Sequence, residues 1–220
     1  LFTGASIGIA MSPDDAEKPT ELLRLADLAM YKAKESGRNQ YHFFARTMQD
    51  KVNRKVSLEG QLRKAIGANE LEVHYQMIVN VQTGNVSGVE ALVRWNHPVE
   101  GMIPPIEFIP VAEESGLIAP LGEWVLREAC RQMAAWHQQG HILKLSVNLS
   151  SQQYHLGFNA KKLTDTLRET GFDAQYLSLE ITESILLEDD RNILEWLHSL
   201  REVGVELSID DFGTGYSSLS

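Results

Sequence analysis

The hydrophobic and polar positions in the first part of the chain predict a small unit of strand, helix and strand. Residues 5–10 are mostly small and apolar and lead into a turn, which predicts a short strand. From Pro19 to Gly37, apolar residues recur every three or four positions, which predicts a helix. A second strand is expected at residues 40–44, and residues 45–68 have the spacing of a connecting helix. The first unit has too small a core to fold well alone. Because the connecting helix links two modules, we expect a module boundary near residue 46.

The rest of the chain alternates strand-like apolar runs with amphipathic helical segments. Strands are expected at residues 71–79, 88–95, 143–149, 176–182 and 205–210, and helices at residues 106–115, 121–138, 161–170 and 191–203. Most of these strands are followed by a helix before the next strand begins. This order is typical of an α/β fold with a parallel sheet, either open or closed into a barrel.

Four of the predicted strands carry an oxygen-bearing side chain among apolar neighbours. Glu90 lies in the second strand, Asn148 in the third, Glu180 in the fourth, and Asp210 and Asp211 at the end of the fifth. A charge inside a buried strand is costly unless it is paired or binds a metal. In a parallel α/β barrel the carboxyl ends of the strands open onto one face, so we expect these side chains to meet there.

Three carboxylates and one amide, from Glu90, Asn148, Glu180 and Asp210, suit a hard cation such as Mg²⁺ or Mn²⁺. Asp211 is offset by one residue and could reach a second cation. Two metal ions about 3.5–4 Å apart would stabilise the attacking and leaving oxygens of a phosphoryl displacement. Taken singly, each carboxylate could equally be structural, and the two adjacent aspartates could form a solvated acidic turn.

Three further acidic residues have structural interpretations. Glu183 could cap a helix, and Glu113 and Glu114 are expected to be solvated charges on the surface of a helix.

The charge and the composition of the chain restrict the ligands and the chemistry that are possible. The chain has 220 residues and a formal net charge of -10, which argues against general binding to DNA or RNA polymers. A phosphate-bearing ligand would need bound cations. The one cysteine, Cys130, excludes an internal disulfide, and its place on an apolar helical face predicts a buried thiol.

Two features of the sequence concern where the protein is located and whether the chain is part of a longer one. We find no apolar run long enough to span a membrane and no signal peptide, which favours a cytoplasmic location. The chain opens at Leu1 and ends at Ser220 abruptly, so we expect a fragment of a longer protein.

Two segments near the start carry a family resemblance. Ala5-Ser6-Ile7-Gly8-Ile9-Ala10 and the run from Ala26 to Asn39 resemble the C-terminal end of a GGDEF, or diguanylate cyclase, domain. The motif that names that family would lie upstream of Leu1. The resemblance implies a GGDEF remnant at residues 1–45 and a helical linker at residues 46–60.

A longer, ordered set of motifs follows. Glu90-Ala91-Leu92 is accompanied by Val147-Asn148-Leu149-Ser150, by Leu179-Glu180-Ile181-Thr182-Glu183 and by the run from Asp210 to Leu219. Together they resemble the EAL-domain cyclic di-GMP phosphodiesterases. The resemblance implies an EAL domain at residues 61–220, truncated before its last strands. The expected fold is an incomplete TIM-like (β/α) barrel with about five of the usual eight strands.

The resemblance also implies roles for individual residues. Glu90, Asn148, Glu180 and Asp210 match metal ligands, Asp211 the second-metal aspartate, Glu183 the glutamate that holds the acidic loop, Arg94 a phosphate-binding arginine and Gln76 a substrate-contacting glutamine. Met77 departs from the family, which usually has proline there, and this is expected to loosen the backbone.

The implied activity is hydrolysis of cyclic di-GMP to linear pGpG with Mg²⁺ or Mn²⁺, with two ions in the complete site. A homodimer through the EAL domain is implied, with any inner-membrane tether in upstream segments. The alternative is a module that binds cyclic di-GMP or dimerises without catalysis. A lysine, a glutamate and a glutamine that complete the family's site would follow Ser220, so we expect this chain alone to be poorly folded or inactive.

Overall fold

The computed structural model describes residues 4–182, 185 and 192–210. The chain divides into two compact units, Leu1–Gly60 and Gln61–Ser220. The division falls inside one helix, α2, which spans Arg46–Ala65. The domain limits expected from the sequence remain predictions.

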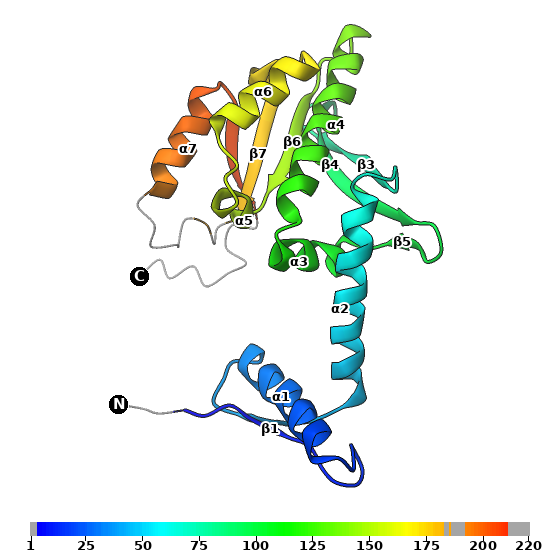
Figure 1. Cartoon of the computed structure of the whole chain (residues 1–220). Helices are drawn as coiled ribbons and strands as arrows, with labels where there is room; N and C mark the ends of the chain where they lie inside the picture. Colours follow the sequence, from blue (N-terminus) through cyan, green and yellow to red (C-terminus); the bar gives the residue numbers. More distant parts are fainter. Residues whose placement is uncertain (1–3, 183–184, 186–191, 211–220) are drawn as a thin grey trace. The chain divides into compact units, whose positions relative to one another are not determined.

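The first unit has the predicted order of strand, helix and strand. It comprises β1 (Ile7–Ile9), α1 (Pro19–Glu35) and β2 (Tyr41–Phe43), and its two strands pair in parallel (Figure 1). Gly8 of β1 lies directly against α1, because an added Cβ would come within 1.9 Å of the Ala26 carbonyl oxygen. The helix can therefore pack closely on this strand only where a side chain is absent.

The second unit is built on a six-stranded sheet. Its strands are β3 (Leu71–Val79), β4 (Val86–His97), β5 (Gly101–Ile103), β6 (Lys144–Leu149), β7 (Leu177–Thr182) and β8 (Glu206–Asp210). Its longer helices are α3 (Pro105–Ser115), α4 (Ile118–Gln138), α6 (Ala160–Thr170) and α7 (Asn192–Glu202), and the short ones are α5 (Ser151–His155) and the 3-10 turn η1 (Ala174–Tyr176). The sequence pattern missed β5, α5 and η1, which are too short for a hydrophobic period to develop.

The strand order is β3-β4-β6-β7-β8. The short strand β5 pairs with the last three residues of β4, Trp95 to His97. Strands β4, β6, β7 and β8 are parallel, as predicted, but β3 and β5 pair antiparallel with β4. The expectation of a parallel sheet was therefore wrong for β3, and β5 was not among the predicted strands. A loop of only six residues, 80–85, joins β3 to β4, and such a short connection can only return the chain antiparallel.

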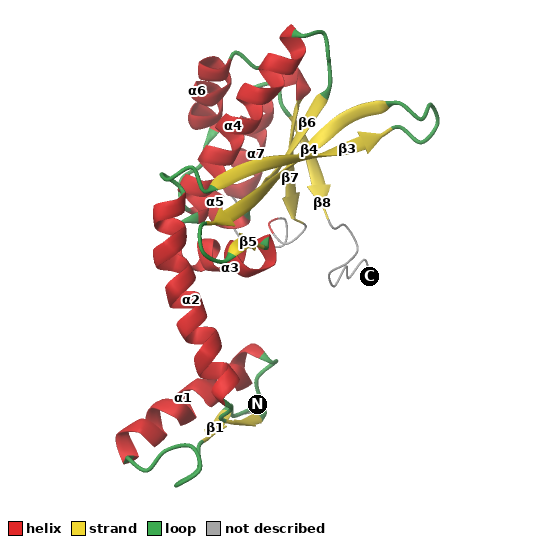
Figure 2. Cartoon of the chain, turned by 90° about the vertical axis from the view of Figure 1, so that its right-hand side faces the viewer, coloured by secondary structure: helices red, strands yellow, loops and turns green. Residues whose placement is uncertain are grey.

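The two faces of the sheet differ. Alternate residues of β6 and β7, including Val147 and Leu179, are buried, and α4, α6 and α7 cover that face (Figures 1 and 2). The intervening positions point the other way: Asn148 and Glu180 keep some exposure there, whereas Ser146 and Ser178 are buried. This alternation places polar side chains on the face opposite the helices.

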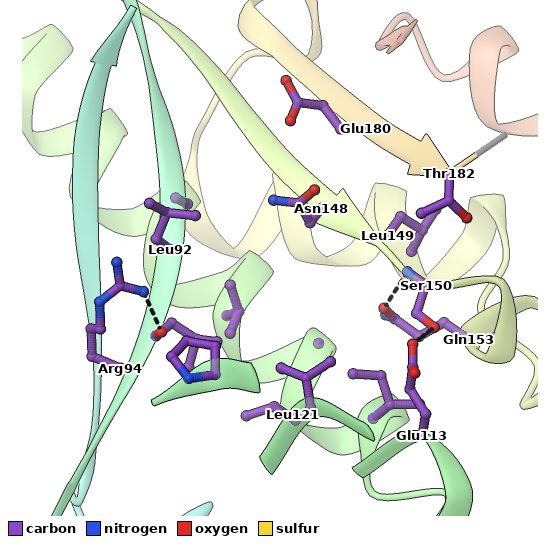
Figure 3. Close-up of a pocket in the computed structure, with 17 residues that line it drawn as sticks. Leu92, Arg94, Glu113, Leu121, Asn148, Leu149, Ser150, Gln153, Glu180 and Thr182 are labelled. Atoms are coloured by element: carbon purple, nitrogen blue, oxygen red, sulfur yellow. Dashed lines mark hydrogen bonds between the residues drawn. The ribbon is translucent and has the colours of Figure 1, made fainter. Parts of the chain in front are cut away.

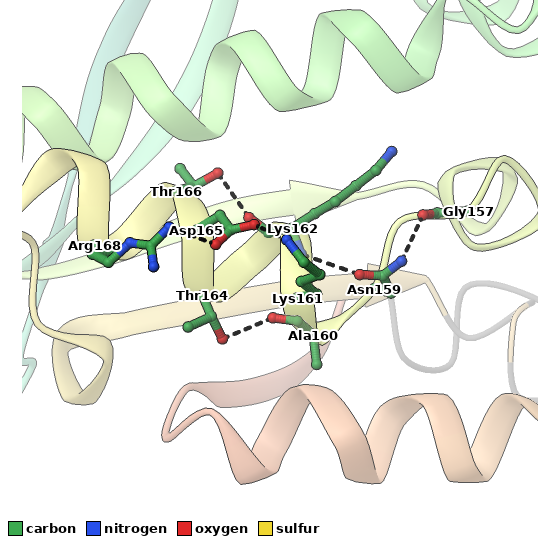
Figure 4. Close-up of polar contacts among 9 residues, drawn as sticks. All are labelled: Gly157, Asn159, Ala160, Lys161, Lys162, Thr164, Asp165, Thr166 and Arg168. Carbon is green, nitrogen blue, oxygen red and sulfur yellow. Dashed lines mark hydrogen bonds and ion pairs between the residues drawn. The ribbon is translucent and has the colours of Figure 1, made fainter.

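A side-chain cap fixes the start of α6. At the start of α6, Asn159 Oδ1 accepts a hydrogen bond from the backbone N–H of Lys162 at 3.1 Å (Figure 4). Within the helix, Asp165 forms ion pairs with Lys161 at 2.6 Å and with Arg168 at 2.9 Å. Because these ion pairs are exposed, each contributes little to stability. The cap therefore contributes more than they do to fixing the residue at which the helix begins.

Among the described residues, no helix combines the length and the apolar character that crossing a membrane requires.

Candidate functional site

Three of the predicted ligand positions come together on adjacent strands. Asn148 on β6 donates a hydrogen bond from Nδ2 to Oε1 of Glu90 on β4, at 2.7 Å. On the other side, Asn148 lies opposite Glu180 of β7 in the parallel register. The three side chains therefore form a row across the sheet, on the face that the helices leave uncovered.

The position of Glu90 within its strand differs from that of the other two residues. It lies in the middle of β4, not near its end, because β4 continues to His97. The parallel pairing with β6 stops at Ala91, and beyond it β4 pairs with β3 and β5. Glu90 is thus at the carboxyl end of the parallel part of its strand, which is where barrel chemistry is found.

The remaining acidic positions are only partly described. The backbone of Asp210 ends β8 and pairs in register with Thr182 of β7, two residues beyond Glu180. Asp211 and Glu183 lie outside the described residues. Their roles remain predictions.

The two predicted substrate-binding residues lie on β3 and β4. Gln76 is exposed and stands directly opposite Glu90 in the antiparallel register, so the two side chains share a face. Arg94 is half-buried and donates from Nη1 to the carbonyl oxygen of Val93 at 2.9 Å. Met77, which follows Gln76, is 67% exposed.

A pocket of about 350 Å³ opens where the sheet meets α3, α4 and α5. Arg94, Asn148 and Glu180 are among the residues that line it (Figure 3). The opposite wall is apolar and comes mostly from α3 and α4, through Pro105, Ile109, Ile118, Leu121 and Val125. Such a cavity, apolar with a few convergent polar groups, is typical of small-molecule sites.

A second polar cluster lines this pocket and was not predicted. Ser150, immediately after β6, donates from Oγ to Oε1 of Glu113 on α3, at 2.6 Å (Figure 3). Its backbone N–H donates to Oε1 of Gln153 on α5 at 3.1 Å. The expectation that Glu113 is a solvated helix charge was therefore wrong, because it is half-buried and bonded across to another element. Its neighbour Glu114 is exposed.

Gln153 is held in a tight space. It is 3% exposed, and an added Cβ at Gly122 of α4 would lie only 2.3 Å from its Nε2 and 2.7 Å from its Cδ. The helix can approach the amide closely because position 122 has no side chain.

The row on the sheet fits a hard cation by its donor chemistry. Glu90 and Glu180 supply carboxylate oxygens, and Asn148 supplies an amide oxygen, the ligand types that Mg²⁺ and Mn²⁺ prefer. Within the described part of the chain, no three His, Cys, Asp or Glu side chains gather as a metal cluster. The row instead combines two carboxylates with the amide of Asn148.

Comparison with known families gives two matches. The EAL domain family matches residues 59–220. The family described as "Diguanylate cyclase, GGDEF domain" matches residues 1–40. Both resemblances found in the sequence are confirmed.

Similar proteins come from several bacteria. The chain is 42% identical to cyclic di-GMP phosphodiesterase PdeR of Escherichia coli, over the whole chain and 33% of that protein. It is 46% identical to the bifunctional diguanylate cyclase/cyclic di-GMP phosphodiesterase MucR of Pseudomonas aeruginosa, over 98% of the chain and 32% of MucR. The chain thus spans about a third of the length of these curated relatives.

A solved structure described as "PaMucR Phosphodiesterase, c-di-GMP complex" has a TM-score of 0.69 and 44% identity, over 74% of this chain and 66% of that one. The expected EAL fold, a TIM-like barrel of which this chain holds part, is thereby confirmed.

Proposed function

Because the chain belongs to the EAL domain family, we propose that the longer protein with the complete barrel, rather than this chain alone, hydrolyses cyclic di-GMP to linear pGpG in a reaction that needs Mg²⁺ or Mn²⁺. The observation that carries the proposal is the row of Glu90, Asn148 and Glu180 across three strands, with Asn148 bonded to Glu90 at 2.7 Å. The names of PdeR and MucR and the ligand of the PaMucR structure support the choice of substrate.

The residues of the row would hold the cations, together with Asp210 and Asp211. A bound divalent cation supplies Lewis-acid stabilisation of the negative charge that develops on the phosphate. It also supplies local positive charge at the site, which weakens the repulsion between a phosphodiester and a chain with a formal net charge of -10.

The neighbouring polar residues would place the substrate. A guanidinium has five N–H donors, so Arg94 can keep its bond to Val93 while it binds a phosphate oxygen. Gln76, opposite Glu90, would contact the nucleotide. Glu183 would hold the loop that follows β8 in its working conformation.

Family membership also leads us to expect a homodimer through the EAL domain. From the sequence we expect a cytoplasmic location, with any inner-membrane tether in upstream segments, and the formal net charge of -10 leads us to expect no binding of DNA or RNA polymers.

The direct test incubates the protein that contains the full barrel with cyclic di-GMP in the presence of Mg²⁺, of Mn²⁺ or of EDTA. Chromatography of the nucleotides then measures how much cyclic di-GMP has been hydrolysed. Glu180→Gln keeps the size of the side chain but removes a charged ligand, and we expect it to lower turnover about 100-fold or more. Glu114→Gln makes the same change at an exposed position on α3 and should leave turnover within about twofold. Binding of cyclic di-GMP without turnover, by the protein with its full barrel, would favour the non-catalytic alternative instead.

A further inference from the structure

Ser150 is held by two elements at once. Its side chain bonds to Glu113 on α3 at 2.6 Å, and its backbone N–H bonds to Gln153 on α5 at 3.1 Å. Both partners belong to the lining of the pocket that also includes Asn148.

The bond to Glu113 is more than helix capping needs. Ser150 and Gln153 already form a complete capping box for α5, which satisfies the first backbone N–H groups of that helix. A half-buried carboxylate from a separate helix is costly to desolvate, and it adds nothing to that cap. What it adds is a fixed distance between α3 and the end of β6.

The end of β6 is also where Asn148 projects. Asn148 precedes Ser150 by two residues, and Leu149 between them is 4% exposed, so the intervening backbone is packed in place. A shift of Ser150 would therefore move Asn148 and disturb its 2.7 Å contact with Glu90. Groups behind a metal ligand commonly set its orientation in this way.

We propose that Glu113 is a positioning residue, which acts through Ser150 to hold Asn148 in the geometry that binds a divalent cation. Gln153 holds the same turn from α5. This role rests on the proposed function, because it presupposes that Asn148 is a metal ligand.

The test measures cation binding directly. Mn²⁺ binding to the full-length protein is followed by calorimetry, alongside kcat and KM for cyclic di-GMP. Glu113→Ala removes the acceptor, and we expect about tenfold weaker Mn²⁺ binding and a lower kcat at saturating substrate. Glu113→Gln keeps an acceptor oxygen for Ser150 and should restore most of the affinity. Glu114→Ala is the matched control on the same helix and should bind Mn²⁺ like the unsubstituted protein.

A second variant guards against a loss of folding. Ser150→Ala removes the hydroxyl that donates the same hydrogen bond to Glu113. Circular dichroism confirms that each variant is folded. If the two residues act through one bond, the double variant should bind Mn²⁺ no more weakly than the weaker single variant.

The outcomes separate the two proposals. If folded Glu113→Ala or Ser150→Ala binds Mn²⁺ as tightly as the unsubstituted protein, the positioning role is wrong and the proposed function stands. Additive losses in the double variant would also overturn it. If the unsubstituted protein neither binds Mn²⁺ nor hydrolyses cyclic di-GMP, both proposals fail.

Discussion

At the scale of single residues, Asn159 determines where α6 begins. Its side chain accepts from the backbone N–H of Lys162, one of the donors that the helix itself cannot satisfy. Replacing it with alanine should lower the free energy of unfolding by about 1 kcal/mol, and Asn159→Asp should keep the cap. Urea unfolding of the three proteins measures the difference. Equal loss in both variants would contradict a capping role.

Cys130 gives a second prediction at this scale. The thiol is fully buried on α4, and this burial raises its pKa to about 12, so almost none is present as the reactive thiolate at neutral pH. We expect a thiol reagent such as DTNB to label the folded protein very slowly at pH 8 and rapidly in urea. Fast labelling without denaturant would mean that α4 opens locally.

At the scale of elements, two glycines should respond in opposite ways to the same substitution. Gly60 lies within α2 and an added Cβ would meet no atom within 4 Å, so Gly60→Ala should stabilise by about 0.5–1 kcal/mol. Gly8→Ala should destabilise the first unit, because its Cβ would collide with the backbone of α1 at Ala26 and Met30. Thermal melting followed by circular dichroism should show opposite shifts. If Gly8→Ala did not lower the melting temperature, the close contact between β1 and α1 would be refuted.

At the scale of the whole molecule, stability should fall in alkali. Burial raises the pKa of Tyr75 from 10.0 to about 12, with a smaller contribution from the charge of Glu128, and burial raises that of Cys130 from 9.0 to about 12. An unfolded chain then loses these protons at lower pH than the folded one. The stability is intact below about pH 9 and is lost progressively as pH rises toward 12.

Urea unfolding at several pH values between 8 and 11 measures this slope. Tyr75→Phe removes one of the two groups, so its free energy of unfolding should fall less steeply above pH 10. Tyr41→Phe, at a position that is 63% exposed, is the control and should leave the slope unchanged. An unaltered slope in Tyr75→Phe would show that the tyrosine titrates alike in both states.

The sequence predicted the long elements well because their periods are long enough to recognise. α1 and α4 each have several turns with a regular apolar face, and the parallel pairing of β6 and β7 followed from the helices between them. That pairing is also why Asn148 and Glu180 could be expected side by side. The antiparallel β3 could have been recognised from its short loop to β4.

The polar cluster behind the site could be predicted only in part. Ser150 and Gln153 have the spacing of a capping box, a local pattern that indicates α5. The bond from Ser150 to Glu113 joins residues 37 positions apart, and no period or spacing in the chain reports such a contact. It depends on how α3 packs near the end of β6, which only the folded structure gives.

The close approach of Gly122 to Gln153 has a consequence for how the family diverges. The space that the glycine leaves is the space that the glutamine amide fills, so neither position can change in size alone. Across relatives, the two positions should therefore covary. A relative with alanine at the place of Gly122 should have a shorter residue at the place of Gln153, and so should have lost the capping box there. Substitutions at the start of α5 would then occur together with substitutions at the facing position of α4.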